Sequence, residues 1–434
     1  MITQPAARRV DERAATQAVE VLTLLFGPPR DYAIRLWNGA VVGTAGSRFV
    51  LALNHPGALR RMLIPPTDLN LGEAYVRNDF DVEGDLEAAI AAMVRAATTR
   101  RPAREWARLT VQALLLPRAS RSGSAPARAR LSGPVHSLDR DRAAVRHHYD
   151  VGNDFYALWL DRRMVYSCAY FPAGTEELDA AQEAKLEHLC RKMRLQPGER
   201  LLDIGCGWGS LVLYAAQRYG VQALGVTLSE PQARWAQQRI AEAGLQDRCR
   251  VEVRDYREVA EGAFDKVVSV GMFEHVGRSR LPEYFGHAWA LLRPGGLFLN
   301  HGISGRRVPP IWLRLGRRAS FINAHVFPDG DLVSVSDALV VAESAGFEVR
   351  DVEGLREHYA RTLHLWVQRI EARRDEAVAL VGEGKYRTWR IFMAGCAYAF
   401  ADGRISVFQA LLAKPDAAGA VALPWSRADI YESP

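Results

Sequence analysis

The sequence predicts an α/β fold whose larger part is a doubly wound, mostly parallel sheet. The first observation is the segment Leu201–Ser210, where an apolar strand-like run enters a loop with glycines at 205, 207 and 209. Glycine lets the backbone turn sharply and approach a ligand closely where the next helix begins. The second observation is the alternation of strand-like and helix-like runs from residue 141 onward, which is typical of a parallel sheet covered by helices.

The N-terminal part, residues 1–116, is expected to be a small mixed α/β domain. Apolar residues recur at helical spacing in three places, 10–26, 85–97 and 106–114, and a further helical part begins at residue 69. Short strand-like runs punctuated by glycine and proline are expected at 32–37, 48–53 and 58–64. Residues 117–140 are rich in Ser, Pro, Gly and Arg and predict a flexible basic linker.

The second part, residues 141–434, contains the alternating pattern. Its first helices are expected at 141–148, 153–160 and 177–194. Strands are expected at 200–204, 222–226, 250–254, 266–270, 297–301 and 347–352, and the helices that follow them at 210–219, 230–243, 281–292 and 335–345. Helices at 361–373 and 384–400 lead to a late strand at 405–412, which fits an antiparallel addition to the sheet.

Positive charge is concentrated in the N-terminal part. Residues 1–140 contain 19 Arg, no Lys and 13 acidic residues, whereas basic and acidic residues balance in the remaining chain. Nine arginines and one acid, Glu105, fall within 95–130. Such a segment suits an anionic membrane surface or a nucleic acid, and the amphipathic helix at 106–114 would suit a membrane surface. The alternative is a solvated arginine-rich helix and linker that packs on its neighbours.

Cysteine usage and the N-terminal sequence argue against several classes of protein. The five cysteines are odd in number and form no C-x-x-C pair, so neither a disulfide framework nor a structural zinc site is expected, and we expect no metal. The N-terminus lacks the apolar core of a signal peptide, and no stretch approaches 18 apolar residues. We therefore expect a cytoplasmic protein that does not span a membrane.

The ends of the predicted strands indicate the cofactor. A dinucleotide-binding sheet usually carries an acid about 20 residues after the glycine loop, but here Thr227 and Gln232 stand nearest that position. The third strand ends in Asp255-Tyr256, an acid that can accept from an adenine amino group and a ring that can stack on adenine. Asp203 would balance a cationic sulfonium or anchor the glycine loop. These features favour S-adenosylmethionine over NAD.

Seven segments, in this order, resemble the cyclopropane fatty acid synthases and the mycolic acid cyclopropane synthases. They are HYDVGNDFY at 148–156, YSCAYF at 166–171, LDIGCGWG at 202–209, GVTLS at 225–229, VGMFEHVG at 270–277, NHGI at 300–303 and FPDG at 327–330. The resemblance covers about 145–412, and the combination is highly specific. The N-terminal part resembles the lipid-engaging domain of the bacterial synthases less clearly.

The resemblance implies a class I methyltransferase fold, which is a Rossmann-like doubly wound sheet of seven strands. It also implies methyl transfer from S-adenosylmethionine to the cis double bond of an unsaturated phospholipid acyl chain. An alkene is a weak nucleophile, so its attack on the sulfonium methyl leaves a carbocation, and closure of a cyclopropane ring then needs a base. The family is known to hold a bicarbonate ion as that base, shielded from water. By the same analogy, the protein would bind peripherally to the inner face of the membrane and would form a homodimer.

The resemblance places the bicarbonate site at five residues. They are Cys168, Glu274, His301, Ile303 through its backbone, and Tyr359. His301 would donate a hydrogen bond to the anion, Tyr359 would add a hydroxyl, and Glu274 would orient His301 or take the released proton onward. Cys168 is not expected to act as a nucleophile, because the reaction needs no acyl intermediate.

The expected cofactor contacts come from the strand ends and from the loop before the helix at 177–194. The family's contacts correspond to Tyr166, Ser167, Gly205, Gly207, Thr227, Leu228, Gln232, Tyr256 and Val270, and the strand-end reasoning adds Asp203 and Asp255. Tyr256 replaces a tryptophan of the mycolic acid branch and should still cover the adenine.

Two departures from the family leave the product open. The family often reads Leu-His-Thr-Ile where this chain has Asn300-His-Gly-Ile303, and the segment 304–320 is unusually basic. That segment would contact phosphates at the membrane or would be a solvated loop. The same carbocation can also lose a different proton after a hydride shift, which would give a methylene- or methyl-branched chain.

Three other functions compete with lipid methylation. A small-molecule amine methyltransferase would not need the base site, because an amine loses its proton readily. A nucleic-acid methyltransferase usually carries Asn/Asp-Pro-Pro-Tyr/Phe after the fourth strand, where this chain has Gly271-Met-Phe-Glu274, so we expect no nucleic-acid partner. A non-catalytic membrane-binding protein would not need an intact glycine loop and base site.

Overall fold

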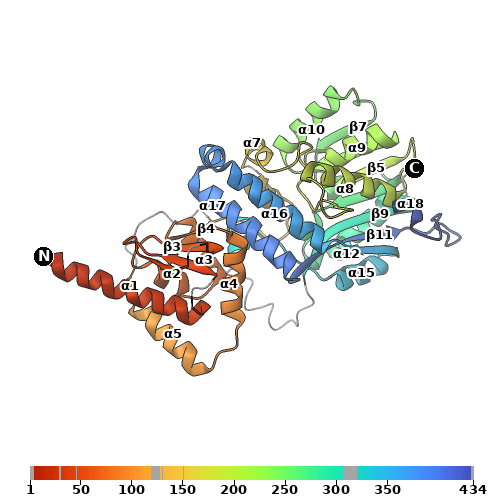
Figure 1. Ribbon diagram of the computed structural model, residues 1–434. Helices are drawn as coiled ribbons and strands as arrows, with labels where there is room; N and C mark the ends of the chain where they lie inside the picture. Colours follow the sequence, from red (N-terminus) through yellow and green to blue (C-terminus); the bar gives the residue numbers. More distant parts are fainter. Residues whose placement is uncertain are drawn as a thin grey trace. The chain divides into compact units, whose positions relative to one another are not determined.

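The chain divides into two compact units, each described here by itself (Figure 1). The computed structural model describes residues 4–28, 31–44, 46–118, 128–129, 131–149, 151–305 and 320–431. The first unit comprises 1–129, 310–326 and 374–398, and the second comprises 130–309, 327–373 and 399–434. These units differ from the expected ranges 1–116, 117–140 and 141–434, because two late segments complete the first unit. Most of the basic segment 304–320, namely 306–319, and residues 119–127 and 130 of the predicted linker lie outside the described residues.

A four-stranded sheet stands at the centre of the first unit. Its order is β2-β1-β3-β4, in which β1 and β3 are parallel and the other pairs are antiparallel. The strands are β1 (Tyr32–Arg35), β2 (Val41–Gly43), β3 (Phe49–Leu53) and β4 (Phe80–Gly84). The helices are α1 (Gln4–Phe26), α2 (Ala58–Leu63), α3 (Asp68–Val76), α4 (Leu86–Thr98), α5 (Ala103–Leu115), α14 (Phe321–His325) and most of α17 (Arg374–Ala401).

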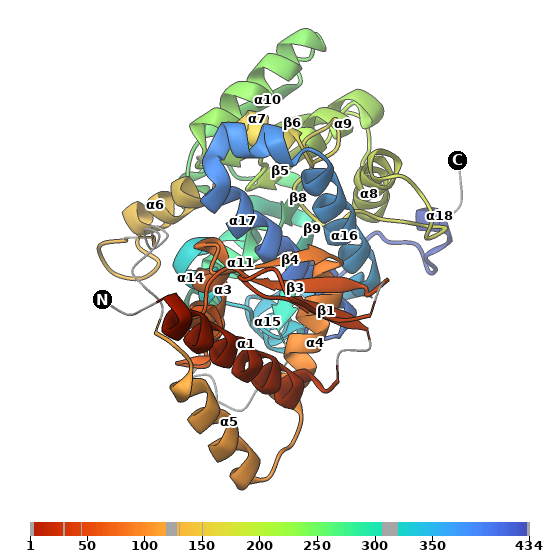
Figure 2. The ribbon, with the colours of Figure 1, turned by 60° about the vertical axis from the view of Figure 1, so that its left-hand side comes forward.

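The strand predicted at 58–64 is wrong, because this segment forms helix α2. Its residues are Ala, Leu, Arg and Met, all of which favour a helix. Figure 2 shows α1 beside α5 and α14 beside α3 in the first unit. The ring of Phe321 in α14 occupies the space where Gly72 of α3 has no side chain.

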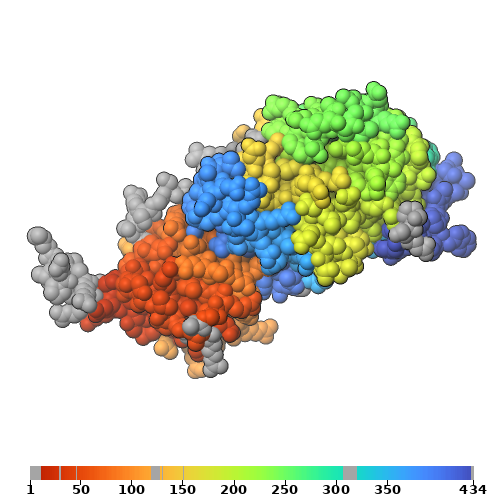
Figure 3. All heavy atoms as spheres, turned by 45° about the horizontal axis from the view of Figure 1, so that its top comes forward, coloured from red at the N-terminus to blue at the C-terminus, as the bar shows by residue number. Residues whose placement is uncertain are grey.

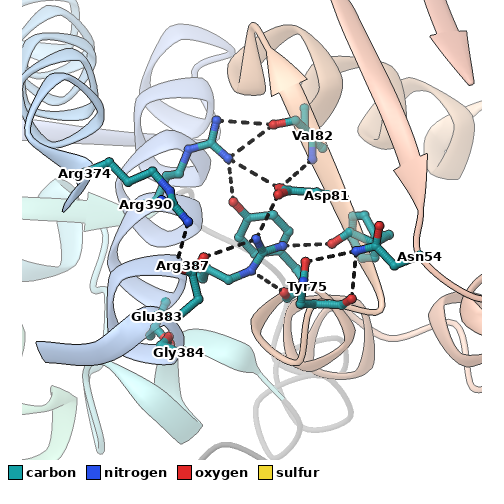
Figure 4. A network of polar contacts seen from close by, with 12 residues as sticks. Asn54, Tyr75, Asp81, Val82, Arg374, Glu383, Gly384, Arg387 and Arg390 are labelled. Carbon is teal, nitrogen blue, oxygen red and sulfur yellow. Dashed lines mark hydrogen bonds and ion pairs between the residues drawn. The ribbon is translucent and has the colours of Figure 1, made fainter. Parts of the chain in front are cut away.

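Two arginines of α17 join this late helix to α3 and β4 within the first unit (Figure 4). The guanidinium carbon of Arg387 lies 4.0 Å from the centre of the Tyr75 ring, and its Nε donates to the Tyr75 carbonyl oxygen at 2.7 Å. Arg387 also donates to the carbonyl of Phe80 (2.8 Å) and to the carboxylate of Asp81 (3.0 Å). Arg390 donates to the hydroxyl of Tyr75 at 2.6 Å. These buried cations are satisfied by acceptors on α3 and β4, so α17 is an integral part of the unit.

A seven-stranded sheet forms the second unit, in the order β10-β11-β9-β8-β5-β6-β7. The strands are β5 (Arg200–Ile204), β6 (Gln222–Thr227), β7 (Cys249–Val253), β8 (Phe264–Val270), β9 (Leu292–Gly305), β10 (Glu348–Gly354) and β11 (Ile405–Ala413). All neighbours are parallel except β11, which is antiparallel to β9 and to β10. The predicted class I methyltransferase sheet and its late antiparallel strand are confirmed.

Helices cover both faces of this sheet. They are α6 (Leu138–Tyr149), α7 (Asn153–Ala157), α8 (Leu178–Met193), α9 (Ser210–Tyr219), α10 (Glu230–Glu242), α11 (Phe273–Val276), α12 (Leu281–Leu291), α15 (Val335–Ser344), α16 (Arg356–Ala372) and α18 (Ala428–Tyr431). Apolar residues of α8, α9 and α10 share one core cluster, and those of α12 and α15 share another. Figure 3 shows the yellow and green residues, which include α8, α9 and α10, as one continuous surface. None of the described helices has both the length and the apolar character needed to cross a membrane.

Candidate active site

The glycine loop joins β5 to α9 as the sequence predicts. Gly205, Gly207 and Gly209 have φ angles of 79°, 56° and 75°, a left-handed region that strongly favours glycine. A Cβ atom at Gly205 would lie 2.9 Å from the side chain of Met272, and one at Gly209 would lie 2.8 Å from Ala236. The loop therefore needs glycine for its backbone conformation and for its close packing.

One cavity of the second unit opens at the carboxyl ends of β5, β6 and β8, where ligands bind in doubly wound sheets. All eleven residues predicted to contact the cofactor line this cavity: Tyr166, Ser167, Asp203, Gly205, Gly207, Thr227, Leu228, Gln232, Asp255, Tyr256 and Val270. The structure thus brings together residues spread over more than a hundred positions. Their contact with S-adenosylmethionine stays a prediction.

Two charged groups are buried in the lining of this cavity. Burial raises the pKa of Asp203 to about 7, an effect that the nearby Lys185 opposes. Burial lowers the pKa of Lys185 to about 8, and the carboxylate of Asp161 opposes this shift most strongly. Asp203 Oδ1 has no hydrogen-bond partner among the described residues. Lys185 was not singled out from the sequence, because it is one of several buried polar residues of α8, with Gln182, His188 and Lys192.

Polar contacts hold the side of the cavity where the sequence predicts adenine. Thr227 Oγ1 donates to Gln232 Oε1 at 3.0 Å. The Asp255 carboxylate was expected to be an acceptor for adenine, and it already accepts from Arg257 at 2.9 and 2.8 Å. The ring of Tyr256 lies edge-on to Tyr284 with centres 5.8 Å apart, which fixes its plane. A ligand amino group would therefore share Asp255 with Arg257.

The five residues of the predicted bicarbonate site are not part of that lining. His301 and Ile303 lie on β9, and Glu274 lies on α11 after β8. Tyr359 lies on α16, and Cys168 lies in the segment before α8. The charge of Glu274 adds to burial in raising the pKa of Tyr149, whose side chain lines the cavity. Glu274 also precedes His275 and lies two residues after Met272, and both of these line the cavity, so Glu274 lies beside the predicted cofactor site.

Glu274 is buried and binds the backbone of β9. The Ile303 N–H donates to Glu274 Oε1, and Oε2 has no partner among the described residues. Burial raises the pKa of Glu274 to about 7, and the bond from Ile303 opposes this shift. Near neutral pH this carboxyl group can therefore exchange a proton.

His301 is buried and neutral. Gln409 of β11 donates to His301 Nδ1 at 3.2 Å, which leaves the ring proton on Nε2, and that atom has no partner among the described residues. Burial lowers the pKa of His301 to about 3, with further lowering by Lys185 and Lys192. The ring is thus set to donate a hydrogen bond to a ligand. The bond that orients the ring comes from Gln409 and not from Glu274, and proton transfer by Glu274 stays a prediction.

Cys168 and the backbone of Tyr359 both contact the carbonyl group of Leu355, whereas the Tyr359 ring packs against Phe400 with ring centres 4.6 Å apart. Cys168 Sγ lies 3.7 Å from the carbonyl oxygen of Leu355, and the N–H of Tyr359 donates to the same oxygen at 3.1 Å. The N–H of Leu355 donates to Val407, which pairs with Ile303 across β11 and β9. Burial raises the pKa of the Cys168 thiol far above its usual range, so the thiol stays neutral.

The packing around β9 explains the two residues that differ from the family's motif, Asn300 and Gly302. Asn300 and Gly302 alternate with His301 and therefore face the opposite side of the strand. Asn300 Oδ1 accepts from the hydroxyl of Tyr284 at 2.8 Å. A Cβ atom at Gly302 would lie 2.8 Å from the ring of Phe273, the residue before Glu274.

The described residues contain no cluster of three or more His, Cys, Asp or Glu side chains that could hold a metal ion.

Comparison with known proteins gives a consistent set of relatives. Residues 136–410 match the mycolic acid cyclopropane synthetase family. A probable fatty acid methyltransferase of Pseudomonas putida is 41% identical over 92% of this chain and 95% of its own length. Cyclopropane mycolic acid synthase 1 of Mycobacterium tuberculosis is 38% identical over 62% of this chain and 95% of its own length.

Two solved structures are similar to the same part of the chain. The cyclopropane synthase MmaA2 from Mycobacterium tuberculosis has a TM-score of 0.60 and 35% identity, and covers 63% of this chain and 98% of its own. The mycolic acid cyclopropane synthase CmaA1, complexed with S-adenosylhomocysteine (SAH) and CTAB, has a TM-score of 0.59 and 37% identity, with the same coverage.

Proposed function

Because the chain belongs to the mycolic acid cyclopropane synthetase family and is an S-adenosylmethionine-dependent methyltransferase, we propose that it methylates the cis double bond of unsaturated phospholipid acyl chains. The observation that carries this proposal is a pair of buried polar atoms, His301 Nε2 and Glu274 Oε2, that have no partner among the described residues. His301 pairs with Val270 and Glu274 precedes His275, and both Val270 and His275 line the predicted cofactor cavity. A methyltransferase that acts on an amine would need neither of the two polar atoms.

The cavity lined by Asp203, Tyr256 and the glycine loop would hold S-adenosylmethionine, which supplies an electrophilic methyl group. The chain's own residues would exclude water from the reacting carbon, since Glu274, His301 and Cys168 are all buried. On attack by the alkene, a C–C bond would form as the S–CH3 bond breaks, which would release S-adenosylhomocysteine and leave a carbocation on the acyl chain. Loss of a proton from the new methyl group to a base would then close a cyclopropane ring.

The residues around His301 fit a bicarbonate ion in part. His301 Nε2 can donate to an anion, and Glu274 can donate when protonated, as its pKa of about 7 allows. The N–H of Ile303 donates to Glu274, so it would bind the ion only after that bond is released. When bound, bicarbonate would supply the base, and Glu274 would move the proton onward.

Helix α5 supports the proposal of an anionic membrane surface as partner. Its residues Leu109 and Ala113 are buried, yet four other apolar side chains are 40–66% exposed: Trp106, Val111, Leu114 and Leu115. Four exposed arginines lie on or beside the helix: Arg100, Arg104, Arg108 and Arg118. A helix with exposed apolar and basic side chains suits the interface of an anionic bilayer. Peripheral location at the inner face of the membrane, and a homodimer, remain proposals from the resemblance.

Mass spectrometry of membrane lipids tests the proposed function. The full chain would be expressed in a host with unsaturated phospholipids and no synthase of its own. We expect monounsaturated chains to gain the mass of one CH2, and the product to resist mild hydrogenation. Uptake of hydrogen would instead indicate a methylene branch. An unchanged lipid mass from a folded protein that binds SAH would favour the amine methyltransferase.

A further inference from the structure

The segment 165–169 carries three predicted site residues but has no regular secondary structure. The three are Tyr166, Ser167 and Cys168. Outside helices and sheets, backbone polar groups need partners from side chains or water. Here the N–H of Ala169 donates to Thr362 Oγ1 of α16 at 3.0 Å. The N–H of Val165 donates to Asp161 Oδ1 at 2.8 Å, and the carbonyl oxygens of Val165 and Ser167 accept from a side chain of α8.

Two buried polar residues of α8 bind this segment. Gln182 and Lys185 are three positions apart, so they share a helix face, and their exposed fractions are 0% and 2%. Gln182 Nε2 donates to the carbonyl oxygens of Val165 (3.3 Å) and Ser167 (2.9 Å). Lys185 Nζ donates to the hydroxyl of Ser167 at 2.8 Å. The Ser167 residue is therefore held through its backbone and its side chain.

Burial of Lys185 at this position is unfavourable for the stability of the folded protein. A buried ammonium group has three N–H donors, and among the described residues Lys185 makes one hydrogen bond, to the neutral hydroxyl of Ser167. An incompletely paired buried charge lowers stability. Lys185 also lines the predicted cofactor cavity. Its pKa of about 8 keeps it mostly protonated at neutral pH, so the charge is retained in the folded protein.

We propose that Lys185, assisted by Gln182, is a positioning residue for the cofactor: its ammonium group holds the Ser167 hydroxyl and the 165–169 segment in the conformation that binds S-adenosylmethionine. This inference rests on the proposed cofactor site and is independent of the lipid substrate.

Lys192 provides a matched control on the same helix. It lies two turns after Lys185 and is equally buried. Its ammonium group donates to the Glu353 carboxylate and lies 3.8 Å from Asp351 Oδ2. Lys192 does not line the cavity. Replacing either lysine by methionine removes a buried charge from α8, but only Lys185→Met removes a hydrogen bond to the segment 165–169.

The test is calorimetric titration of SAH into the purified full chain. We expect Lys185→Met to raise the SAH dissociation constant tenfold or more, and Lys192→Met to change it less than twofold even where it lowers the melting temperature. Gln182→Met, which keeps the buried charge of Lys185, should raise the SAH dissociation constant threefold or more. In a Ser167→Ala background, Lys185→Met should raise the SAH dissociation constant less than threefold further, because the bond between Lys185 and the Ser167 hydroxyl is already absent.

The outcomes separate this inference from the proposed function. SAH binding to Lys185→Met with wild-type affinity would overturn the inference and leave the cofactor site intact. A full tenfold loss in the Ser167→Ala background would show that Lys185 acts independently of Ser167, which also overturns it. If the wild-type chain did not bind SAH, the cofactor site and the inference would both fail.

Discussion

The backbone N–H of Ile303 donates a hydrogen bond to the carboxyl group of Glu274. This bond joins the turn after β8 to the end of β9 and occupies one oxygen of a carboxyl group whose other oxygen has no partner among the described residues. Glu274 is thus fixed on one side and available for chemistry on the other.

Replacing Glu274 by glutamine should preserve the bond from Ile303, since the amide oxygen still accepts, but remove proton transfer. We expect turnover to fall about 10²- to 10⁴-fold, with SAH affinity changed less than threefold. The measurement is release of SAH in the presence of vesicles of monounsaturated phospholipid. Normal turnover by Glu274→Gln would remove this residue from the mechanism.

The same variant should alter the pH dependence of stability. The native carboxyl group has a pKa of about 7, raised by burial from 4.5, so between these values the native state binds more protons than the unfolded state. Stability from this group is present below pH 4.5 and is lost as pH rises toward 7 and beyond. The free energy of unfolding of Glu274→Gln, relative to that of the wild type, should therefore increase by up to about 3 kcal/mol from pH 4 to pH 8. Urea unfolding at both pH values measures the gain, and parallel pH profiles would contradict it.

His301 and its partner Gln409 give a graded prediction. His301→Ala removes the donor at Nε2 and should abolish turnover while SAH still binds. Gln409→Leu keeps the donor but removes the bond that orients the ring. We expect turnover to fall about 10- to 100-fold for Gln409→Leu, by analogy with the loss of residues that orient metal-bound histidines. Equal turnover in Gln409→Leu and wild type would show that the ring needs no such support.

A side chain at position 302 should be accommodated only if the ring of Phe273 moves or is replaced by a smaller side chain. We expect Gly302→Ala to destabilise the protein by about 1–3 kcal/mol, because a Cβ would overlap the Phe273 ring. Gly286→Ala is the control, since among the described residues no atom beyond the glycine's own helix turn and chain neighbours lies within 4 Å of the added Cβ, and alanine favours a helix. Thermal unfolding compares the two, and Phe273→Leu should restore part of the loss at 302. Equal stability of the two alanine variants would contradict this account.

Vesicle binding should depend on α5 and on salt. We expect Trp106→Ala, and the double change of Arg104 and Arg108 to Gln, each to weaken sedimentation with anionic vesicles several-fold. Binding of the wild type should fall between 0.05 and about 0.5 M salt, because exposed charges are screened. Arg234→Gln, an exposed arginine of α10, serves as the charge control. Salt-insensitive binding would exclude the electrostatic part of the proposal.

Local features of the fold were predictable, and distant contacts were not. The glycine loop was predictable because Gly205, Gly207 and Gly209 each need a positive φ. The α2 helix was missed because apolar content alone does not separate a short strand from a short helix. The bond between Arg387 and Tyr75 joins residues 312 positions apart, and helical periodicity shows which face is buried but not against what.

In the predicted site, too, some features could be predicted from the sequence and others could not. Most of the predicted cavity residues lie at or just after strand ends, which topology brings together, so their gathering followed from the order of strands. Tyr166 and Ser167 lie instead in the segment before α8. Gln409 was missed because it is a single polar residue in a buried apolar strand. Lys185 was missed because α8 carries several buried polar residues, so its pattern does not separate the buried face from the exposed one. In hindsight, the isolated glutamine within the apolar run of β11 is the signal that a buried partner exists.

Helix α17 has a consequence for synthesis of the protein on the ribosome. The sheet of the first unit is translated first, but the arginines that bind Tyr75 and Phe80 are translated after nine-tenths of the chain, roughly 15–60 s later. The second unit also waits for a late strand, because β11 lies between β9 and β10. Neither unit can therefore reach its final form on the nascent chain until the C-terminal region has been made, and a prematurely terminated polypeptide would leave both incomplete and exposed to proteolysis.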